Sequence, residues 1–287
     1  MKVLIYEGFL HHKNKQGLER LLKHKGIEFT YDVRDGASCS LVYSPADAID
    51  TEKYPHKKFI FGPHFSVFPT EKLTAINNVR NNGIYIQPSE WAVKCWREMN
   101  AESAIPLRSF CFPVDTDKFK PSTDRKNRKT VFVYSKSRHP QELKLVEHVL
   151  KSRGIGYRIF DYVKGYREEE YLRCLQDSKL GIVLGRHESQ GFAIEEALSC
   201  DVPLLVWDVR SMNQEQGQNY PDVPATSIPY WDGRCGEWFY EGCKLNDKLT
   251  ELLNKWNEYK PREYVLENLS VEKCADNFMK LVDEIKL

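Results

Sequence analysis

The sequence of 287 residues has no long apolar run and almost no net charge. Because a membrane-spanning helix needs roughly 18–20 apolar residues, we expect no integral membrane segment. The 42 basic and 41 acidic residues leave a formal charge of +1. This balance argues against nucleic acid or another polyanion as the partner, although it allows a local basic pocket for a small phosphate group.

Other signatures are missing as well. The eight cysteines form no CxxC pair, which argues against a zinc ribbon or a thioredoxin-type redox site. No G-x-S-x-G elbow, Walker A loop or H-E-x-x-H motif occurs, and no cluster has metal-ligand spacing. The opening MKVLIYEGF is too soon interrupted for a signal peptide. We therefore expect a cytoplasmic protein, in which the sequon at Asn268 is accidental.

What the sequence does contain is an alternation of short apolar strands and amphipathic helices, which predicts an α/β fold with parallel sheets. The length favours two modest domains over one. The polar stretch KPSTDRKNRK at 120–129 has no apolar periodicity and reads as a linker. We predict one domain at 1–122, a second at 123–268, and a final helix at 269–287 that crosses back onto the first.

Each domain has its own series of predicted elements. Ser89 and Ser270 are the expected N-caps of the helices that follow them. Strands are expected at 2–6, 39–43, 58–61, 83–87, 130–134, 156–160, 180–184 and 203–207, and helices at 17–24, 90–99, 140–153, 168–176, 192–200 and 270–285.

The segment at 188–203, ESQGFAIEEALSCDVP, has the strongest chemical pattern. A strand, a polar turn, Gly191 and a helix start place free backbone N–H groups at the carboxyl edge of a sheet, which suits a phosphate. Glu196, inside the helix, suits a ribose diol, and Glu188, in the turn, suits sugar hydroxyls. The alternative is that Glu188 and Glu195 are dipole-favoured acids and Glu196 a solvated helix residue.

Three segments resemble segments of a single protein family, and they occur in the same order along the chain as in that family. They are QPSEWAVKCWREMN followed by FPVDTDKFKP, then EEEYLRCLQDSKLGIVLG, then RHESQGFAIEEALSCDVPLLVWD. The last resembles the E-x7-E segment of retaining GT-B glycosyltransferases of family 4. Asp201 replaces the usual glycine of the turn that follows, and Asp also visits the left-handed conformation. Pro113 stands where the family usually has glycine.

The resemblance implies a GT-B fold, in which two Rossmann-like lobes enclose a donor-binding cleft. Glu188 would then hold the donor sugar, Glu196 the ribose, and Ser189, Gln190 and Gly191 the diphosphate.

Basic residues that neutralise the donor's diphosphate are expected in such a fold after the first strand of the second lobe. Here VFVY is followed by Lys136 and Arg138, with Lys144 further on. The family's usual spacing is not reproduced, so the choice among the three stays open. We favour Lys136 and Arg138, which follow the strand directly; the alternative is a surface loop with two cations.

The first lobe offers weaker candidates. His64 follows a strand end, where relatives often carry a histidine near the donor sugar, although a lone loop histidine is more often structural. Gly8 lies in the first βα turn, where the family often has a glycine-rich loop that touches phosphate. The D-x-D at Asp115 and Asp117 spells a metal motif of another fold, but it lies in the inter-lobe turn, and we do not assign a metal to it.

The sequence therefore predicts a retaining hexosyltransferase-type glycosyltransferase. It would transfer a sugar from a nucleotide diphosphate sugar to a glycan, lipid or protein acceptor without metal or cofactor, using Glu188, His64, Lys136 and Arg138 at the reacting centre. Two alternatives stay open: a non-catalytic nucleotide-sugar-binding protein and a GT-B epimerase.

Overall fold

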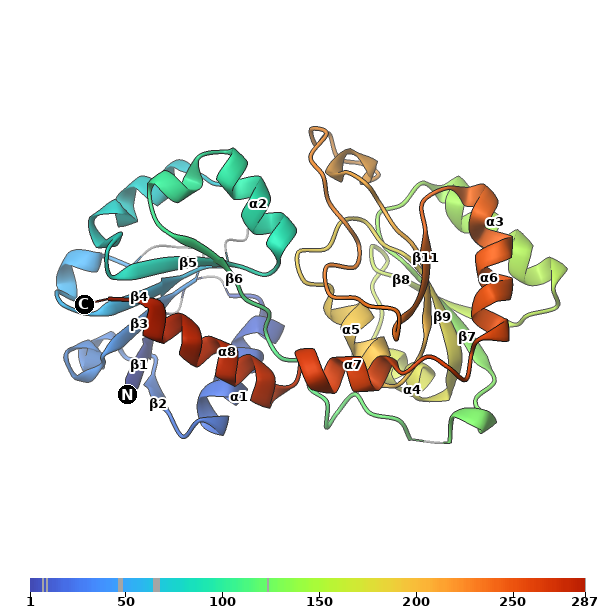
Figure 1. Ribbon diagram of the computed structural model, residues 1–287, viewed down its shortest axis with the longest axis horizontal. Coiled ribbons are helices and arrows are strands. Elements are labelled where there is room, and N and C mark those ends of the chain that lie inside the picture. Colours follow the sequence, from blue (N-terminus) through green and yellow to red (C-terminus); the bar gives the residue numbers. More distant parts are fainter. Residues whose placement is uncertain (7, 9, 46–48, 64–67, 123, 287) are drawn as a thin grey trace. The chain divides into compact units, whose positions relative to one another are not determined.

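The apolar strands of each half pair into a sheet that is parallel throughout (Figure 1). The computed structural model describes every residue except 7, 9, 46–48, 64–67, 123 and 287. The chain divides into two units. One is Met1–Pro113 with Leu269–Leu287, and the other is Val114–Asn268.

The first unit is built on a six-stranded sheet of order β2-β1-β3-β4-β5-β6. Its core joins Leu4, Val42 and Phe59 of the sheet to Trp96 of a covering helix, all less than 1% exposed. The strands are β1 Lys2–Ile5, β2 Glu28–Thr30, β3 Leu41–Ser44, β4 Lys58–Phe61, β5 Gly83–Gln87 and β6 Leu107–Ser109, and the helices are α1 His12–His24, α2 Glu90–Glu98 and α8 Val271–Glu284.

The second unit is built on a five-stranded sheet of order β11-β10-β9-β7-β8. Val133, Ile182 and Leu205 from three of its strands pack with Leu249 of a helix in its core. The strands are β7 Thr130–Ser135, β8 Tyr157–Asp161, β9 Ser178–Leu184, β10 Leu204–Trp207 and β11 Gly236–Phe239, and the helices are α3 Pro140–Ser152, α4 Glu168–Asp177, α5 Phe192–Ser199, α6 Leu245–Asn254 and α7 Pro261–Asn268.

The last helix, α8, packs on α1 in the first unit. The rings of Phe278 and Phe110 meet edge to face with centroids 5.8 Å apart. At the helix end Glu284 accepts a hydrogen bond from Arg108 at 2.7 Å. Ser270 caps α8 by accepting from the Lys273 N–H, as its position predicts.

The unit boundary lies at Pro113/Val114, earlier than the expected boundary at 122/123. Phe119 is the physical reason. Its side chain is buried, and its carbonyl accepts hydrogen bonds from Ser199 (2.5 Å) and Arg262 (3.1 Å) in the second unit. Residues 114–122, expected in the first domain, therefore belong to the second unit.

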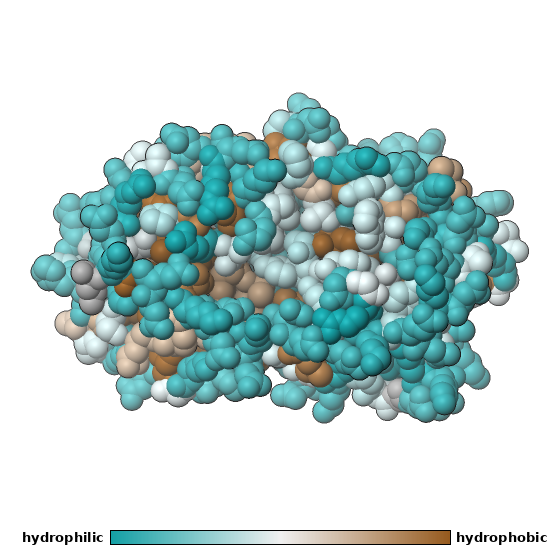
Figure 2. All heavy atoms as spheres, in the orientation of Figure 1, coloured by the Kyte–Doolittle hydropathy of each residue, from teal (hydrophilic) through white to brown (hydrophobic). Residues whose placement is uncertain are grey.

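All eight strands expected from the sequence are present, with ends shifted by at most two residues. Among the strands and α-helices of the described residues, β2, β6, β11, α6 and α7 were not predicted. Ser89 does occupy the N-cap position of α2, but its side chain makes no capping hydrogen bond. Figure 2 shows that the visible face is mostly hydrophilic, with hydrophobic residues in small separate groups.

Candidate functional site

Charged residues gather at the carboxyl edge of the second sheet. Lys136 directly follows β7, Tyr162 follows β8, and residues 185–188 follow β9. These strands are neighbours in the order β9-β7-β8, so parallel pairing brings their carboxyl ends to one edge. The backbone continues this pairing beyond the strands, since the Lys136 N–H donates to the Leu184 carbonyl at 2.9 Å.

Lys136 and Glu188 form a buried ion pair at this edge. The Lys136 Nζ lies 2.7 Å from Oε1 and 2.9 Å from Oε2 of Glu188. Both residues are less than 10% exposed. The same ammonium lies 4.3 Å from the ring centroid of Tyr162, a cation–π contact. The structure thus brings together two of the predicted site residues, and it adds an aromatic ring that the sequence reading did not consider.

Arg138, the second predicted cation, is held by the protein itself. Its Nη1 donates to the carbonyls of Gly185 (3.0 Å) and Trp207 (2.7 Å). Its Nε and Nη2 each donate to one carboxylate oxygen of Glu142 at 2.8 Å. Glu142 also accepts from the His139 N–H and so completes the capping box of α3. Arg138 therefore ties the ends of β9 and β10 to the start of α3. Lys144 is exposed on α3.

Arg186 is a third cation at this edge, and the sequence reading passed over it. Its Nη1 donates to both carboxylate oxygens of Glu215, at 2.7 and 2.8 Å. Burial lowers the pKa of Arg186, but the hydrogen bond to Glu215 and the charge of Glu188 outweigh this, and the pKa is raised. The signal that could have found Arg186 is its place two residues before Glu188, just past the end of β9.

His187 lies between these charges. Its Nδ1 is 3.5 Å from Glu215, and its ring packs edge to face on Tyr220. Burial, followed by the positive charges of Arg186 and Lys136, lowers the pKa of His187 to about 4. The imidazole is therefore neutral at physiological pH.

The start of α5 comes just after residues 185–188 in the chain. Gly191 is its N-cap and has a left-handed φ of 94°, which glycine adopts at little cost. Ser189 is exposed, whereas Gln190 is buried and donates to Glu195 at 3.0 Å. At the other end, Asp201 has a φ of 61°. The predicted left-handed Asp in this turn is confirmed.

Glu196 is buried on α5, at 4% exposure. The charge of Glu196 contributes to the pKa shifts of two neighbouring residues, Tyr166 and Lys118. Burial raises the pKa of Tyr166, and Glu196 adds to the shift. The pKa of Lys118 is raised first by its hydrogen bond to Glu168, and Glu196 again contributes. The alternative interpretation of Glu196 as a solvated helix residue is wrong, because this side chain lies inside the second unit.

Asp208 supports the site from the end of β10, and the sequence reading missed it. Its carboxylate accepts from the Ser227 N–H (2.6 Å) and the Thr226 hydroxyl (2.8 Å). The Thr226 carbonyl in turn accepts from the Glu188 N–H at 2.9 Å. Burial raises the pKa of Asp208 in spite of these hydrogen bonds. Asp208 thus fixes the loop that positions the Glu188 backbone.

Two further residues that the sequence singles out, Gly8 and Asp115, lie in the first and the second unit respectively. Gly8 donates its N–H to the Tyr6 carbonyl at 2.9 Å within the first βα turn. His64 lies outside the described residues. Asp115 caps a turn by accepting from the Lys118 N–H at 3.0 Å. Among the described residues, no group of three or more His, Cys, Asp or Glu side chains could hold a metal ion.

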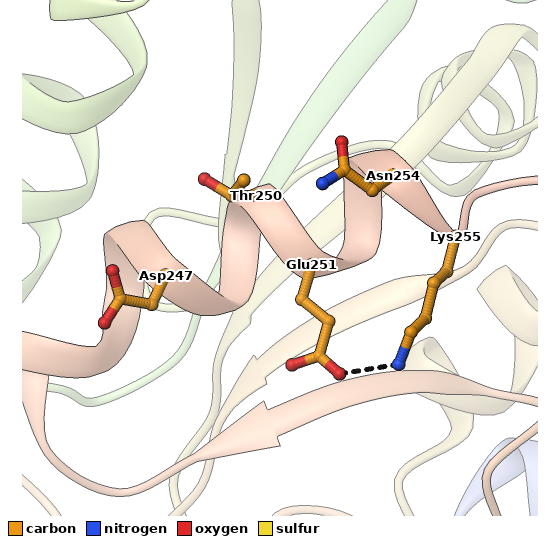
Figure 3. A pocket seen from close by; sticks show the side chains of 5 residues that line it. All are labelled: Asp247, Thr250, Glu251, Asn254 and Lys255. Carbon is orange, nitrogen blue, oxygen red and sulfur yellow. Dashed lines mark hydrogen bonds and ion pairs between the residues drawn. The ribbon is translucent and has the colours of Figure 1, made fainter.

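A surface pocket along α6 is a separate feature (Figure 3). Asp247, Thr250, Glu251 and Asn254 of α6, together with its C-cap Lys255, line it. Glu251 and Lys255 pair with each other at 2.8 Å. The lining side chains are exposed or half-buried, and nothing in them resembles a reactive centre. In the described part of the chain, no helix combines the length and the apolar character needed to cross a membrane.

No protein-family model matches this chain, and no curated protein matches it by sequence. Solved structures do resemble it. The lipopolysaccharide outer core galactosyltransferase WaaB has a TM-score of 0.58 at 13% identity, with 99% of each chain covered. TarM has a TM-score of 0.56 at 15% identity, and the pneumococcal O-GlcNAc transferase GtfA, solved with UDP and GlcNAc, 0.55 at 13%.

Both of these last matches cover 85% of this chain, which spans only 55% of the TarM chain and 56% of the GtfA chain. At such low identities the likeness concerns the fold. The fold of this protein is GT-B, the class predicted from the sequence: two units, each with a parallel sheet and flanking helices.

Proposed function

We propose that this protein is a glycosyltransferase that uses a nucleoside diphosphate sugar as donor. The observation that carries the proposal is the buried Lys136–Glu188 pair at the edge of the second sheet, immediately before the start of α5. A cation, a carboxylate and the N-terminal end of a helix together match the phosphate and hydroxyl groups of such a donor. The GT-B fold and the named activities of WaaB and GtfA agree with this choice.

In the proposed mechanism the bond from the anomeric carbon to the diphosphate oxygen breaks, and a bond from that carbon to the acceptor oxygen forms. The leaving phosphate oxygen takes the acceptor's proton, so no carboxylate base is needed. Lys136 and the N-terminal backbone of α5 (189–191) stabilise the departing negative charge. Glu188 holds sugar hydroxyls, and Glu196 accepts hydrogen bonds from the ribose diol. We propose retention at the anomeric carbon.

Because protein cations neutralise the diphosphate, we propose that transfer needs no metal ion. The eight cysteines are all free thiols, which suits a reducing compartment, and we propose that the protein acts in the cytoplasm. The acceptor is a glycan, a lipid or a protein.

A donor-hydrolysis screen tests the proposal. The protein is incubated without acceptor in UDP-, GDP- and ADP-sugars, and release of the free sugar and the nucleoside diphosphate is followed, with and without EDTA. We expect slow release from one nucleotide class, unaffected by EDTA, and abolished in Glu188→Gln. Binding without turnover would instead indicate a non-catalytic nucleotide-sugar-binding protein. Conversion of the donor sugar to its epimer would indicate the epimerase alternative. Absence of both binding and turnover would refute the proposal.

A further inference from the structure

Two arginines lie at the carboxyl edge of the second sheet, and they differ in which donors are already used. Arginine can bind an oxyanion side-on through Nε and Nη2, which point to the same side of the guanidinium. In Arg138 this side is filled by the two carboxylate oxygens of Glu142. Its Nη1 is filled by two backbone carbonyls. Arg138 therefore has no side left for a ligand.

Arg186 shows the opposite arrangement. Glu215 takes only its Nη1, with both carboxylate oxygens. In the described part of the chain its Nε is buried and has no hydrogen-bond partner. The Arg186 side chain as a whole is 28% exposed. A buried N–H without a partner is costly, and a ligand oxygen would remove that cost.

The surroundings of Arg186 indicate the chemical class of that ligand. Arg186 lies two residues from Glu188, whose carboxylate holds the ammonium of Lys136 at 2.7 Å. Glu215, which is only 6% exposed, fixes Arg186 through Nη1 and makes no hydrogen bond to Nε. Two cations at the ends of the adjacent strands β9 and β7, one with a buried N–H that has no partner among the described residues, form a seat for an anion with several oxygens.

We propose that Arg186 is the second phosphate-binding cation of this site, with Lys136 as the first, and that Glu215 positions it. The ligand is the diphosphate of a nucleotide, an inference that rests on the proposed function. Arg138 is a positioning residue that joins the strand ends and does not touch the ligand. Binding through Nε and Nη2 leaves the pair with Glu215 intact, so the ligand gains a bidentate contact without breaking an existing one.

Binding measurements with the full chain test this assignment. Isothermal titration calorimetry is run with UDP, GDP and ADP, with the corresponding nucleosides, and with inorganic pyrophosphate. We expect Arg186→Gln to weaken diphosphate binding by about 10-fold or more, because a bidentate charged contact is lost. Nucleoside binding should not change. Arg186→Lys keeps the charge but cannot bind side-on. Its affinity for diphosphates should lie between those of the unaltered protein and of Arg186→Gln.

The matched control is Arg158→Gln, since Arg158 is an exposed arginine of the same unit that pairs with Glu170 at 3.0 Å. This variant should bind every probe as the unaltered protein does. Circular dichroism melting checks that each variant is folded. If Arg186→Gln does not fold, Arg186→Lys carries the test, and full affinity for diphosphates and pyrophosphate in that variant would refute side-on binding.

The outcomes separate this inference from the proposed function. Nucleoside diphosphate binding that survives Arg186→Gln unchanged overturns the inference and leaves the proposed function standing. Pyrophosphate binding that Arg186→Gln abolishes, together with no binding of any nucleotide, supports the anion seat and refutes the donor. If the unaltered protein binds neither pyrophosphate nor nucleotide, both are wrong.

Discussion

The two sheets are both parallel and flanked by helices, but different kinds of residues follow their strands at the carboxyl edge. In the first unit, β3, β4 and β5 run into Ser44-Pro45, Gly62-Pro63 and Gln87-Pro88. Where the structure describes these ends, it shows neutral hydrogen bonds. The Tyr43 hydroxyl donates to the Gly62 carbonyl at 2.6 Å, and Ser44 accepts from the Ile49 N–H.

In the second unit the strand ends carry cations and carboxylates in pairs. Lys136 pairs with Glu188, Arg138 with Glu142, and Arg186 with Glu215. A parallel sheet thus supplies the edge, and the few residues after each strand decide which charges the described part of that edge carries. The difference teaches that fold class places a site, whereas the residues just past the strands give it its chemistry.

The largest expected effect comes from breaking the most buried pair. Lys136→Met leaves the Glu188 carboxylate buried without its cation, which should lower the free energy of unfolding by about 3–5 kcal/mol. Urea denaturation measures it. The control Lys255→Met removes an exposed partner of Glu251 and should cost less than about 1 kcal/mol. Equal losses in the two variants would contradict the contrast between buried and exposed pairs.

A pH dependence should follow from His187. Its folded-state pKa of about 4 lies below its ordinary value of 6.5, so the unfolded chain binds this proton more tightly. The stabilisation is complete above pH 6.5 and is lost as the pH falls to 4, by up to about 3 kcal/mol. Unfolding free energies measured from pH 7 to pH 4 should fall less steeply in His187→Gln.

The exposed His148 offers a control for that measurement. His148→Gln should retain the steep slope of the unaltered protein. A His187→Gln variant with the same slope as His148→Gln would show that charge at the edge of the second sheet does not govern stability in acid.

Nucleotide binding should separate the two edges directly. Glu196→Ala removes the proposed ribose partner and should weaken nucleoside diphosphate binding by about 1.5–3 kcal/mol, the range for a hydrogen bond to a charged group. Gln87→Leu changes a buried neutral residue at the edge of the first sheet and should leave this affinity unchanged. Calorimetry with UDP, GDP and ADP compares them. If only Gln87→Leu lost affinity, the nucleotide would belong to the first unit.

The smallest expected effect tests the neutral hydrogen bonds of the first unit. Ser270→Ala removes the hydroxyl that accepts from the Lys273 N–H at the start of α8, and it should cost about 1 kcal/mol. Ser89 occupies the same position on α2 without a capping bond, so Ser89→Ala should cost less. Thermal melts of the two variants give the order, and the reverse order would show that cap geometry does not decide it.

Much of the fold was predictable because it depends on local pattern. Runs such as KFIF at β4 and GIYIQ at β5 are apolar and bounded by turns, and both were predicted to the residue. The strands β2 and β6 have three residues each, too few to show a period. The partner strands, rather than the local sequence, select them.

The candidate site was predictable only in part. The spacing of Glu188 and Glu196 around Gly191 pointed to the sheet edge at which the charged residues gather, because a strand, a turn and a helix start are local features. Which of the cations keeps hydrogen-bond donors available for a ligand could not be read from the local sequence. Arg138 lies only two residues beyond Lys136, which directly follows β7. Only the positions of Glu142, Gly185 and Trp207 show that the donors of Arg138 are used.

By itself, the sequence determined the class of fold and the edge at which its charges gather, since strand periodicity and residue order along the chain are sufficient for both. Only the tertiary structure decided which charged side chain faces which partner. Glu215 lies 29 positions from Arg186, and Glu188 lies 52 from Lys136. Pairs so distant in sequence are set by sheet order and packing, and no local pattern encodes them.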